Sequence, residues 1–122
     1  MEKNITTEEY VKMMSQREPD ENCPVRKTLE LLSGKWRTYV IFELSKKKFC
    51  RFGELKKAIP KITNTMLTST LRDLEDIGIV NRRQFNEIPP HVEYSLTEKG
   101  RKLTPVFLKL QNGEKKIYKG CF

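Results

Sequence analysis

Residues 51–100 read RFGELKKAIPKITNTMLTSTLRDLEDIGIVNRRQFNEIPPHVEYSLTEKG, and this segment predicts a helix, a tight turn, a second helix and a β-hairpin, in that order. The first helix has apolar residues at helical spacing, namely Phe52, Leu55 and Ile59. The second helix has the same pattern in Leu67, Leu71 and Leu74. Residues 60–61 end the first helix and Gly78 ends the second, after which residues 79–85 and 92–96 predict two short strands. This is the layout of a winged helix-turn-helix, which inserts a helix into the DNA major groove.

With 122 residues the chain has room for one domain. We expect a mainly α fold with a small β-hairpin (α+β), in which a winged helix-turn-helix carries dimerisation helices at both ends. An N-terminal helix and connector occupy residues 1–22, the winged-helix core occupies residues 23–100, and a C-terminal dimerisation helix and tail occupy residues 101–122. The sequence shows no apolar run near the roughly 20 residues of a membrane span. Three cysteines do not indicate a disulfide framework here, so we expect a cytoplasmic protein with no membrane partner.

The net charge of +8 is unevenly distributed. Residues 1–22 carry three basic and six acidic side chains, a balance of −3, so the remaining residues carry +11. A body this basic attracts polyanions, of which nucleic acid is the commonest inside cells. Ribosomal proteins and proteins of membrane surfaces have similar charge, so the charge alone does not decide between them and a DNA-binding protein.

Two helices are predicted before the core helix. Thr6 and Glu9 form a capping box for a helix that runs to about Arg17. Pro24 suits the first turn of the next helix, which residues 33–34 interrupt. The apolar residues of this second helix that we expect to point inward are Val25, Leu29 and Leu32.

A third helix over residues 35–44 is apolar enough to be the buried core helix. Its apolar residues are Trp36, Tyr39, Val40, Ile41 and Leu44. Residues 49–51 predict a brief strand that joins the hairpin. After the hairpin, Thr97 caps a last helix, within which Pro105 predicts a kink. Residues 112–113 predict its end, after which residues 114–122 either resume as helix or fray.

The outward face of the helix that begins at residue 64 is the predicted base-reading surface. Because its leucines point inward, the residues of its N-terminal half that point outward are Asn64, Thr65, Thr68, Ser69 and Arg72. Short hydroxyl and amide side chains allow close approach to base edges, and Arg72 suits phosphate or guanine. The C-terminal half ends in Asp73, Glu75 and Asp76, which phosphate repels, so we expect it to stay outside the groove. Taken singly, these residues are also compatible with an ordinary solvated helix face.

The hairpin and its neighbours supply further predicted DNA contacts. Arg82 and Arg83 are adjacent in a strand and therefore point to opposite faces, and we expect Arg83 to point to the DNA together with Asn81. His91, which we take to be exposed beside the hairpin tip, is compatible with a phosphate or minor-groove contact that strengthens on protonation, or with a merely solvated side chain. Basic residues that we expect to flank the groove as phosphate contacts, or to be plain surface charge, include Arg51 and Lys61.

Apolar residues outside the central unit predict a two-fold interface. Those of the first and last helices are Tyr10, Val11, Met14, Leu103, Phe107 and Leu110. Winged-helix proteins of this size use two copies to span half-sites about one helical turn apart. We therefore expect a homodimer on a palindromic operator in double-stranded DNA.

Cys23 is the predicted reactive thiol. It begins a helix that also carries Arg26 and Lys27, and helix amides and cations favour thiolate, so we expect a lowered pKa for Cys23. A small electrophile, a mixed disulfide with a small thiol, and pairing across the dimer are all compatible with this position, as is a purely structural role. Cys50, between Phe49 and Phe52, is predicted to be core, and Cys121 to be an incidental exposed thiol.

From Cys23 onward the sequence resembles the HxlR family of bacterial winged-helix transcription regulators, relatives of the MarR group. The matching segments are residues 23–25, 34–36, 51–55, 71–75 and, above all, 88–100. The resemblance implies a homodimer on a palindromic operator, with small-molecule or redox control in some members, and it implies that Cys23 corresponds to the sensing cysteine of such members. The chain departs from the family pattern at His91, at Thr70 in the recognition helix, and at Gly113.

These features predict a sequence-specific, dimeric transcription regulator that responds to oxidants or electrophiles through Cys23. The alternatives are a winged helix that acts as a protein-interaction module without sequence-specific DNA binding, and a small thiol-dependent redox protein. The sequence has one histidine, no C-x-x-C spacing and no Gly-rich phosphate loop. It therefore predicts no enzyme, no catalytic residues, no cofactor and no metal site.

Overall fold

The structure is a computed structural model that describes residues 5–18 and 23–117, with side chains described as far as Asn112. The chain forms two units, residues 1–30 and residues 31–122. The second unit contains the predicted core helix, the helix-turn-helix and the hairpin, but not most of the helix that begins at Pro24. The division falls within the second helix, whereas the sequence places the start of the core after residue 22.

The first unit contains α1 (Thr7–Ser15) and most of α2 (Pro24–Leu31). The predicted capping box is confirmed: Glu9 N donates to Thr6 Oγ1 and Thr6 N donates to Glu9 Oε2, both at 3.1 Å. The start of α2 at Pro24 is also confirmed. The inward orientation of Val25 and Leu29 is wrong, because both are exposed. Leu31 and Leu32, which already belong to the second unit, pack against its core.

The core of the second unit is built around α3 (Lys35–Ser45), as predicted. Val40, Ile41 and Leu44 are fully buried, and Trp36 is partly buried against them. Tyr39 was also predicted to lie in the core, but 47% of it is exposed. Successive helix residues turn by about 100°, so Tyr39 falls with Phe42 on the other face of α3.

The helix-turn-helix follows the sequence pattern closely. It consists of α4 (Phe52–Ala58) and α5 (Asn64–Asp76), joined by a turn in which Lys61 has a left-handed φ of 70°. Thr63 caps α5, since its hydroxyl accepts a hydrogen bond from Met66 N at 3.1 Å. The buried residues of α5 are Leu67, Thr70, Leu71 and Leu74. Thr70 therefore points inward, so its departure from the family pattern does not alter the outer face.

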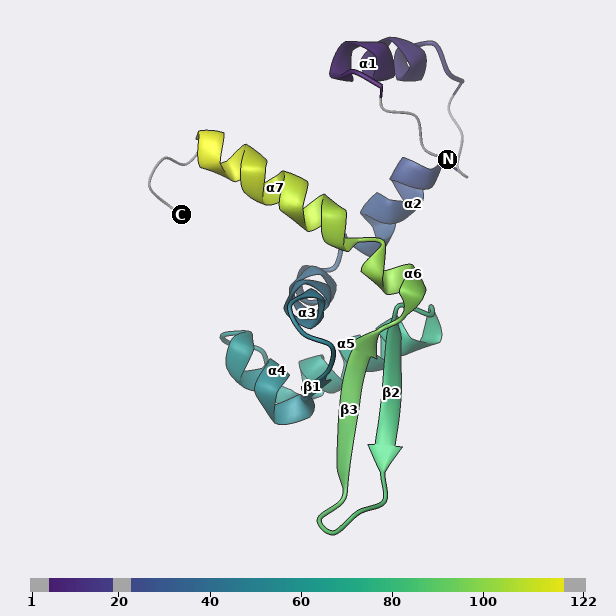
Figure 1. Cartoon of the computed structure of the whole chain (residues 1–122). Coiled ribbons are helices and arrows are strands. Elements are labelled where there is room, and N and C mark those ends of the chain that lie inside the picture. The colour runs from purple at the N-terminus through teal and green to yellow at the C-terminus, as the bar shows by residue number, and fades with distance from the viewer. Residues whose placement is uncertain (1–4, 19–22, 118–122) are drawn as a thin grey trace. The chain divides into compact units, whose positions relative to one another are not determined.

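The sheet has three antiparallel strands in the order β1-β3-β2. β1 (Cys50–Arg51) joins the hairpin of β2 (Val80–Phe85) and β3 (His91–Leu96), which confirms the predicted brief strand. Val80 pairs with Leu96 at the base of the hairpin, and Phe85 pairs with His91 near its tip. The hairpin extends beyond the helices of the second unit (Figure 1). Its tip, residues 86–90, contains a cis Ile88–Pro89 peptide bond.

The predicted last helix is two helices, α6 (Glu98–Arg101) and α7 (Thr104–Ile117). The Thr97 cap is confirmed, because its hydroxyl accepts from Gly100 N at 3.0 Å. The kink at Pro105 is wrong: the break precedes Pro105, which lies in the first turn of α7, where its missing N–H removes no helical hydrogen bond. The end at residues 112–113 is also wrong, since α7 continues to Ile117; a glycine inside a helix costs only about 1 kcal/mol relative to alanine.

Candidate nucleic-acid interface

The outer face of α5 brings the predicted base-reading residues together. A surface hollow of about 400 Å³ is lined by Asn64, Thr65, Thr68, Ser69, Arg72 and Asp73. The first five are the predicted set, and all of them are exposed. Asp73, the other residue that lines the hollow, has its Oδ2 3.9 Å from Arg37 Nη2 of α3. This ion pair partly neutralises the first acidic residue of the helix, and the exposed Glu75 and Asp76 follow in its last turn.

A second groove connects α5 to the hairpin. It has a volume of about 340 Å³ and is lined by Thr68, Leu71, Arg72, Glu75, Arg82 and Tyr94. Thr68 and Arg72 border both hollows, so the polar face of α5 continues onto β2. Arg82 is the cation that the hairpin contributes to this surface, and the sequence prediction missed it. Val80 could have indicated this. It is apolar and buried, and Arg82, two residues later in the same strand, points to the same face of the sheet.

Arg83 lies on the opposite face of the hairpin from Arg82. Its guanidinium carbon is 4.7 Å from the centroid of the Phe85 ring, an arrangement of the cation–π type. Its partner in β3 is Glu93, whereas Arg82 is paired with Tyr94. The structure therefore does not bring Arg83 together with the predicted residues of α5.

His91 is held on the same face as Arg83 and is not an exposed side chain as predicted. Its ring stacks on Phe85 with centroids 4.6 Å apart, and only 17% of the side chain is exposed. Its Nε2 is 3.4 Å from Glu93 Oε2 and its Nδ1 is 4.0 Å from Glu87 Oε2. These carboxylates repel a phosphate group.

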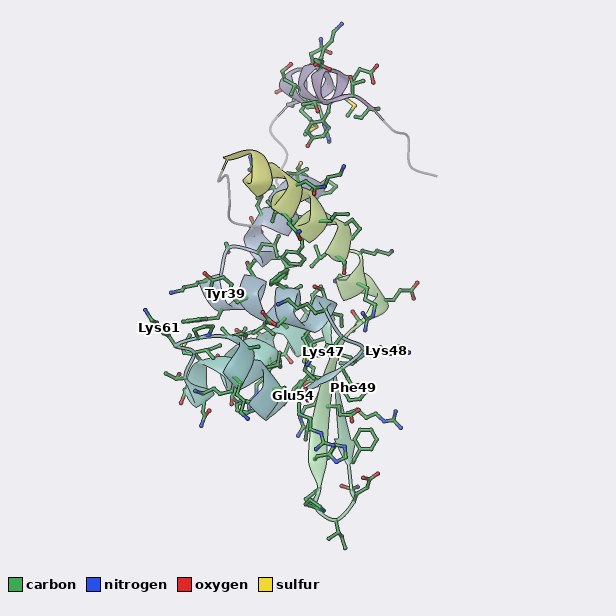
Figure 2. All side chains as sticks on the ribbon, turned by 60° about the vertical axis from the view of Figure 1, so that its left-hand side comes forward. Tyr39, Lys47, Lys48, Phe49, Glu54 and Lys61 are labelled. Carbon is green, nitrogen blue, oxygen red and sulfur yellow. The ribbon has the colours of Figure 1, made fainter. Side chains whose placement is uncertain are left out.

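Arg51 and Lys61, the predicted flanking cations, are both exposed at the ends of α4. Arg51 N donates to Glu54 Oε1 at 3.0 Å, and Lys47 Nζ lies 3.4 Å from Glu54 Oε2 (Figure 2). The hydrogen bond from Arg51 N, together with Lys47, lowers the pKa of Glu54. Glu54 thus remains ionised close to Arg51. Lys61 lies two residues before the Thr63 cap of α5, where it also lines a cleft against α3.

The described cysteines differ in their surroundings. Cys23 is half-buried at the start of α2, and its carbonyl accepts a hydrogen bond from Lys27 N at 3.0 Å, as an N-cap residue does. Cys50 is buried, as predicted, and burial raises the pKa of its thiol. Cys121 lies outside the described residues.

Within residues 5–18 and 23–117, no three or more histidine, cysteine or acidic side chains are grouped so as to hold a metal ion. No described helix has the length and apolar character that crossing a membrane requires.

Comparison with known proteins identifies the family. Residues 31–119 match the model of the HxlR-like helix-turn-helix family. The HTH-type transcriptional regulator YdeP of Bacillus subtilis is 48% identical over 96 residues, which cover 78% of this chain and 74% of YdeP.

Solved structures agree with this match. A MarR-family transcriptional regulator from Porphyromonas gingivalis W83 aligns with a TM-score of 0.75 and 38% identity, over 85% of this chain and 99% of that one. The redox regulator HypR in its oxidised form aligns with a TM-score of 0.69 and 41% identity, over 77% of this chain and 96% of that one. The chain therefore belongs to the HxlR-like helix-turn-helix family and is a DNA-binding transcription regulator.

Proposed function

We propose that this regulator binds a palindromic operator as a homodimer, with the N-terminal half of α5 in the major groove and the hairpin beside it. The observation that carries the proposal is the hollow on α5, in which the five polar residues of its N-terminal half are exposed side by side. Their side chains are short enough for the helix to approach base edges, and the free N–H groups of the first turn favour phosphate.

The cations around this surface have different roles in the proposal. Arg72 and Arg82 border one groove and contact the DNA from the helix and the strand, respectively. Arg51 and Lys61 contact phosphate groups of the DNA backbone on either side of the groove. Arg83 and His91, on the far face of the hairpin, make a smaller contribution, and His91 mainly holds the hairpin tip through its stacking on Phe85.

The dimer interface uses the exposed apolar residues of the two terminal helices. In α1, Tyr10 and Val11 are exposed and Met14 is half-buried. Leu103, just before α7, and Phe107, within it, pack against the core of their own unit. The centroids of the Phe107 and Phe42 rings are 5.5 Å apart. The exposed apolar residues that α7 offers to a partner are therefore Val106, Leu108 and Leu110.

Selection of binding sites from random DNA tests the proposal. We expect the purified protein to select an inverted repeat, because two identical copies related by a two-fold axis read identical half-sites. Thr68→Val and Ser69→Ala should each change the preferred base at one or two positions in every half-site, with discrimination altered by about 10-fold or more. Asp76→Asn, in the last turn of the same helix, is the matched control and should leave the selected sequence unchanged. Selection of the same sequence by all variants would show that α5 does not read bases.

We also propose that Cys23 is a sensing thiol that reacts with a small electrophile or forms a mixed disulfide with a small thiol. Its place at the start of α2 supports this, since helix amides and the nearby Arg26 and Lys27 stabilise a thiolate. The resemblance to HypR, a redox regulator, also supports it.

Alkylation kinetics test the role of Cys23. In a Cys121→Ser background at pH 7, iodoacetamide should modify Cys23 at least about 10-fold faster than Cys50, because only a thiolate reacts and burial keeps Cys50 protonated. The rate of Cys23 alkylation should rise with pH, and the midpoint of this rise should lie below about pH 8.5, the ordinary pKa of a thiol. Peptide mass spectrometry measures both rates, and Cys23→Ser identifies the modified peptide. A midpoint for Cys23 at or above the ordinary value would contradict the assignment.

A further inference from the structure

A cleft between α3 and α4 is not used by the proposed DNA contacts, apart from Lys61. Its volume is about 400 Å³, and the residues that line it are Lys35, Trp36, Tyr39, Phe42, Glu43, Ala58, Ile59, Pro60 and Lys61. This volume is within the range of small-molecule sites, about 300–1,000 Å³. All of the lining residues belong to the second unit. Tyr39 and Lys61 extend from the same side of that unit (Figure 2).

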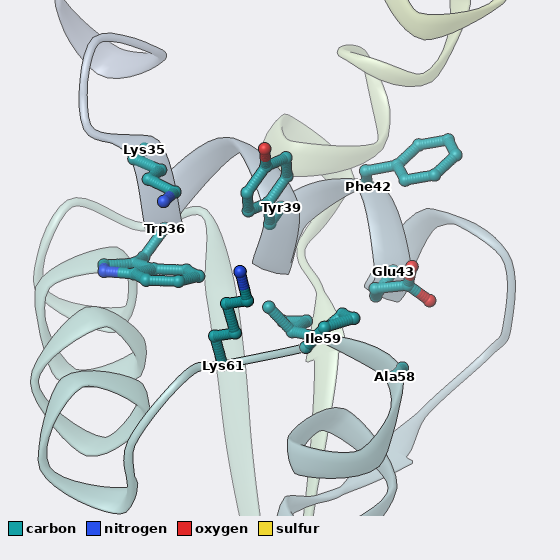
Figure 3. A pocket seen from close by; sticks show the side chains of 9 residues that line it. Lys35, Trp36, Tyr39, Phe42, Glu43, Ala58, Ile59 and Lys61 are labelled. Carbon is teal, nitrogen blue, oxygen red and sulfur yellow. The ribbon is translucent and has the colours of Figure 1, made fainter.

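The walls of the cleft suit a flat aromatic group. The rings of Trp36 and Tyr39 are 5.9 Å apart at an interplanar angle of 63°, so they present two differently oriented surfaces. Ile59 is buried at the base of the cleft (Figure 3). Tyr39 is the exposed aromatic residue that the sequence pattern had placed in the core. Its exposure leaves an apolar ring facing solvent beside the cleft, and a ligand ring can cover it.

The charges of the cleft suit an anion. Lys35 Nζ lies 4.6 Å from the centroid of the Trp36 ring, and the Lys61 ammonium points up between Trp36 and Tyr39 (Figure 3). Among the described residues, no carboxylate forms an ion pair with either lysine. The one carboxylate in the cleft, Glu43, already pairs with Lys46 Nζ at 3.0 Å. The cleft therefore offers two ammonium groups, beside aromatic rings, to the negative group of a ligand.

We propose that this cleft binds an aromatic carboxylate, whose ring lies against Trp36 and Tyr39 and whose carboxylate is held by Lys35 and Lys61. Lys61 also connects the cleft to the DNA surface, because it lies in the turn that leads into α5. A carboxylate bound to Lys61 removes a cation from the DNA surface, so the ligand lowers affinity for the operator. This last step depends on the proposed DNA-binding function, whereas binding of the ligand does not.

The indole N–H of Trp36 reports binding directly, because Trp36 is the single tryptophan of the chain. We expect 1-naphthaleneacetate to shift its signal in a ¹H–¹⁵N NMR spectrum of the full chain in a saturable manner. The neutral 1-naphthaleneacetamide should bind at least about 10-fold more weakly, since it cannot form a charge-assisted contact with the two ammonium groups. Acetate at equal concentration, which has the charge without the ring, should give no saturable shift.

Variants locate the site. Lys61→Asn, which tolerates a left-handed φ, and Tyr39→Ala, at an exposed position, should each weaken binding about 10-fold or more. Lys57→Gln removes a charge from α4 outside the cleft and should bind as the natural chain does. The absence of a saturable shift, or equal binding by the amide or by Lys61→Asn, would overturn the proposal. A Trp36 signal that changes on dilution of the protein but not with the carboxylate would also overturn it, and would show that a second copy covers the cleft.

The regulatory step has its own measurement. With a labelled operator, 1-naphthaleneacetate should lower the affinity of the natural chain about 5-fold or more and leave Tyr39→Ala unaffected. Ligand binding without any loss of DNA affinity would overturn the regulatory step alone. A chain that bound no DNA would overturn the proposed function, while the NMR titration would still decide whether the cleft is a ligand site.

Discussion

Replacing Gly100 with alanine should destabilise the second unit by about 1–3 kcal/mol, the usual cost of forcing an extra methyl group into a packed site. A Cβ at Gly100 would lie 2.5 Å from the backbone oxygen of Ile79 and 3.2 Å from Leu96 Cδ2. The first contact is with backbone and cannot be relieved by a change of rotamer. Either α6 or the start of the hairpin has to move.

That movement is costly because Ile79 O and the two carbonyl groups before it accept hydrogen bonds that hold α6 in place. Thr97 N donates to Ile79 O at 3.0 Å, and the Thr97 hydroxyl donates to Gly78 O at 2.6 Å. Lys99 Nζ adds a third contact, to Ile77 O at 3.1 Å. A shift of α6 weakens all three, so the junction of α5, β2 and α6 loosens together.

Gly53→Ala is the matched control, since it adds the same methyl group to a helix of the same unit. A Cβ at Gly53 meets nothing within 4 Å. Alanine there should leave stability unchanged or raise it by up to about 1 kcal/mol, because alanine is the better helix former. Chemical denaturation measures both variants. Equal unfolding midpoints for the two would show that α6 does not approach Ile79 as closely as the structure indicates.

Much of this fold was predictable because one helix pattern and a few local signals determine it. The leucines of α5 repeat at helical spacing, so they fix its inner face and, by exclusion, the outer face with Thr68 and Ser69. Thr6, Thr63 and Thr97 mark helix starts, because each hydroxyl accepts a hydrogen bond from the backbone N–H three residues ahead. These signals depend on local sequence alone.

Several errors concern residues whose environment is set by distant parts of the chain. An apolar residue such as Tyr39 or Phe107 is compatible with a core or with a surface, and only the packing of α3 and α7 assigns Phe107 to the core. Tertiary packing likewise decides which face of the hairpin lies against α5. The apolar Val80, on the same face as Arg82, was the one indication of it in the sequence. The cleft around Trp36 depends on the approach of α4 to α3 and has no local signature.

The electrostatic part of DNA binding should depend on Arg82 more than on Arg83. Arg82 shares a groove with Arg72 and Thr68 of α5, whereas Arg83 stacks on Phe85 on the far face of the hairpin. If Arg82 contacts one phosphate, a dimer carries two such contacts. Arg82→Ala should therefore reduce the slope of log affinity against log salt by about 2, since each phosphate contact contributes roughly 0.9. Base preference should not change.

Arg72→Ala should have a different signature if Arg72 reads a guanine. Loss of one bidentate contact costs about 1–3 kcal/mol, and each half-site loses one, so affinity for the operator should fall by about 30-fold or more. Discrimination at one base pair in each half-site should fall at the same time. Binding to unrelated DNA should change much less.

Titration of labelled operator at several salt concentrations distinguishes these outcomes. Lys102→Ala, at the exposed C-cap of α6, removes an equal charge at the other end of the sheet from the hairpin tip. It should leave both the slope and the base preference close to those of the natural chain. If Arg83→Ala reduced the slope more than Arg82→Ala, the DNA would meet the face of the hairpin that carries Phe85 and His91. Since that face is turned away from α5, the helix and the hairpin could not then contact the DNA as one continuous surface.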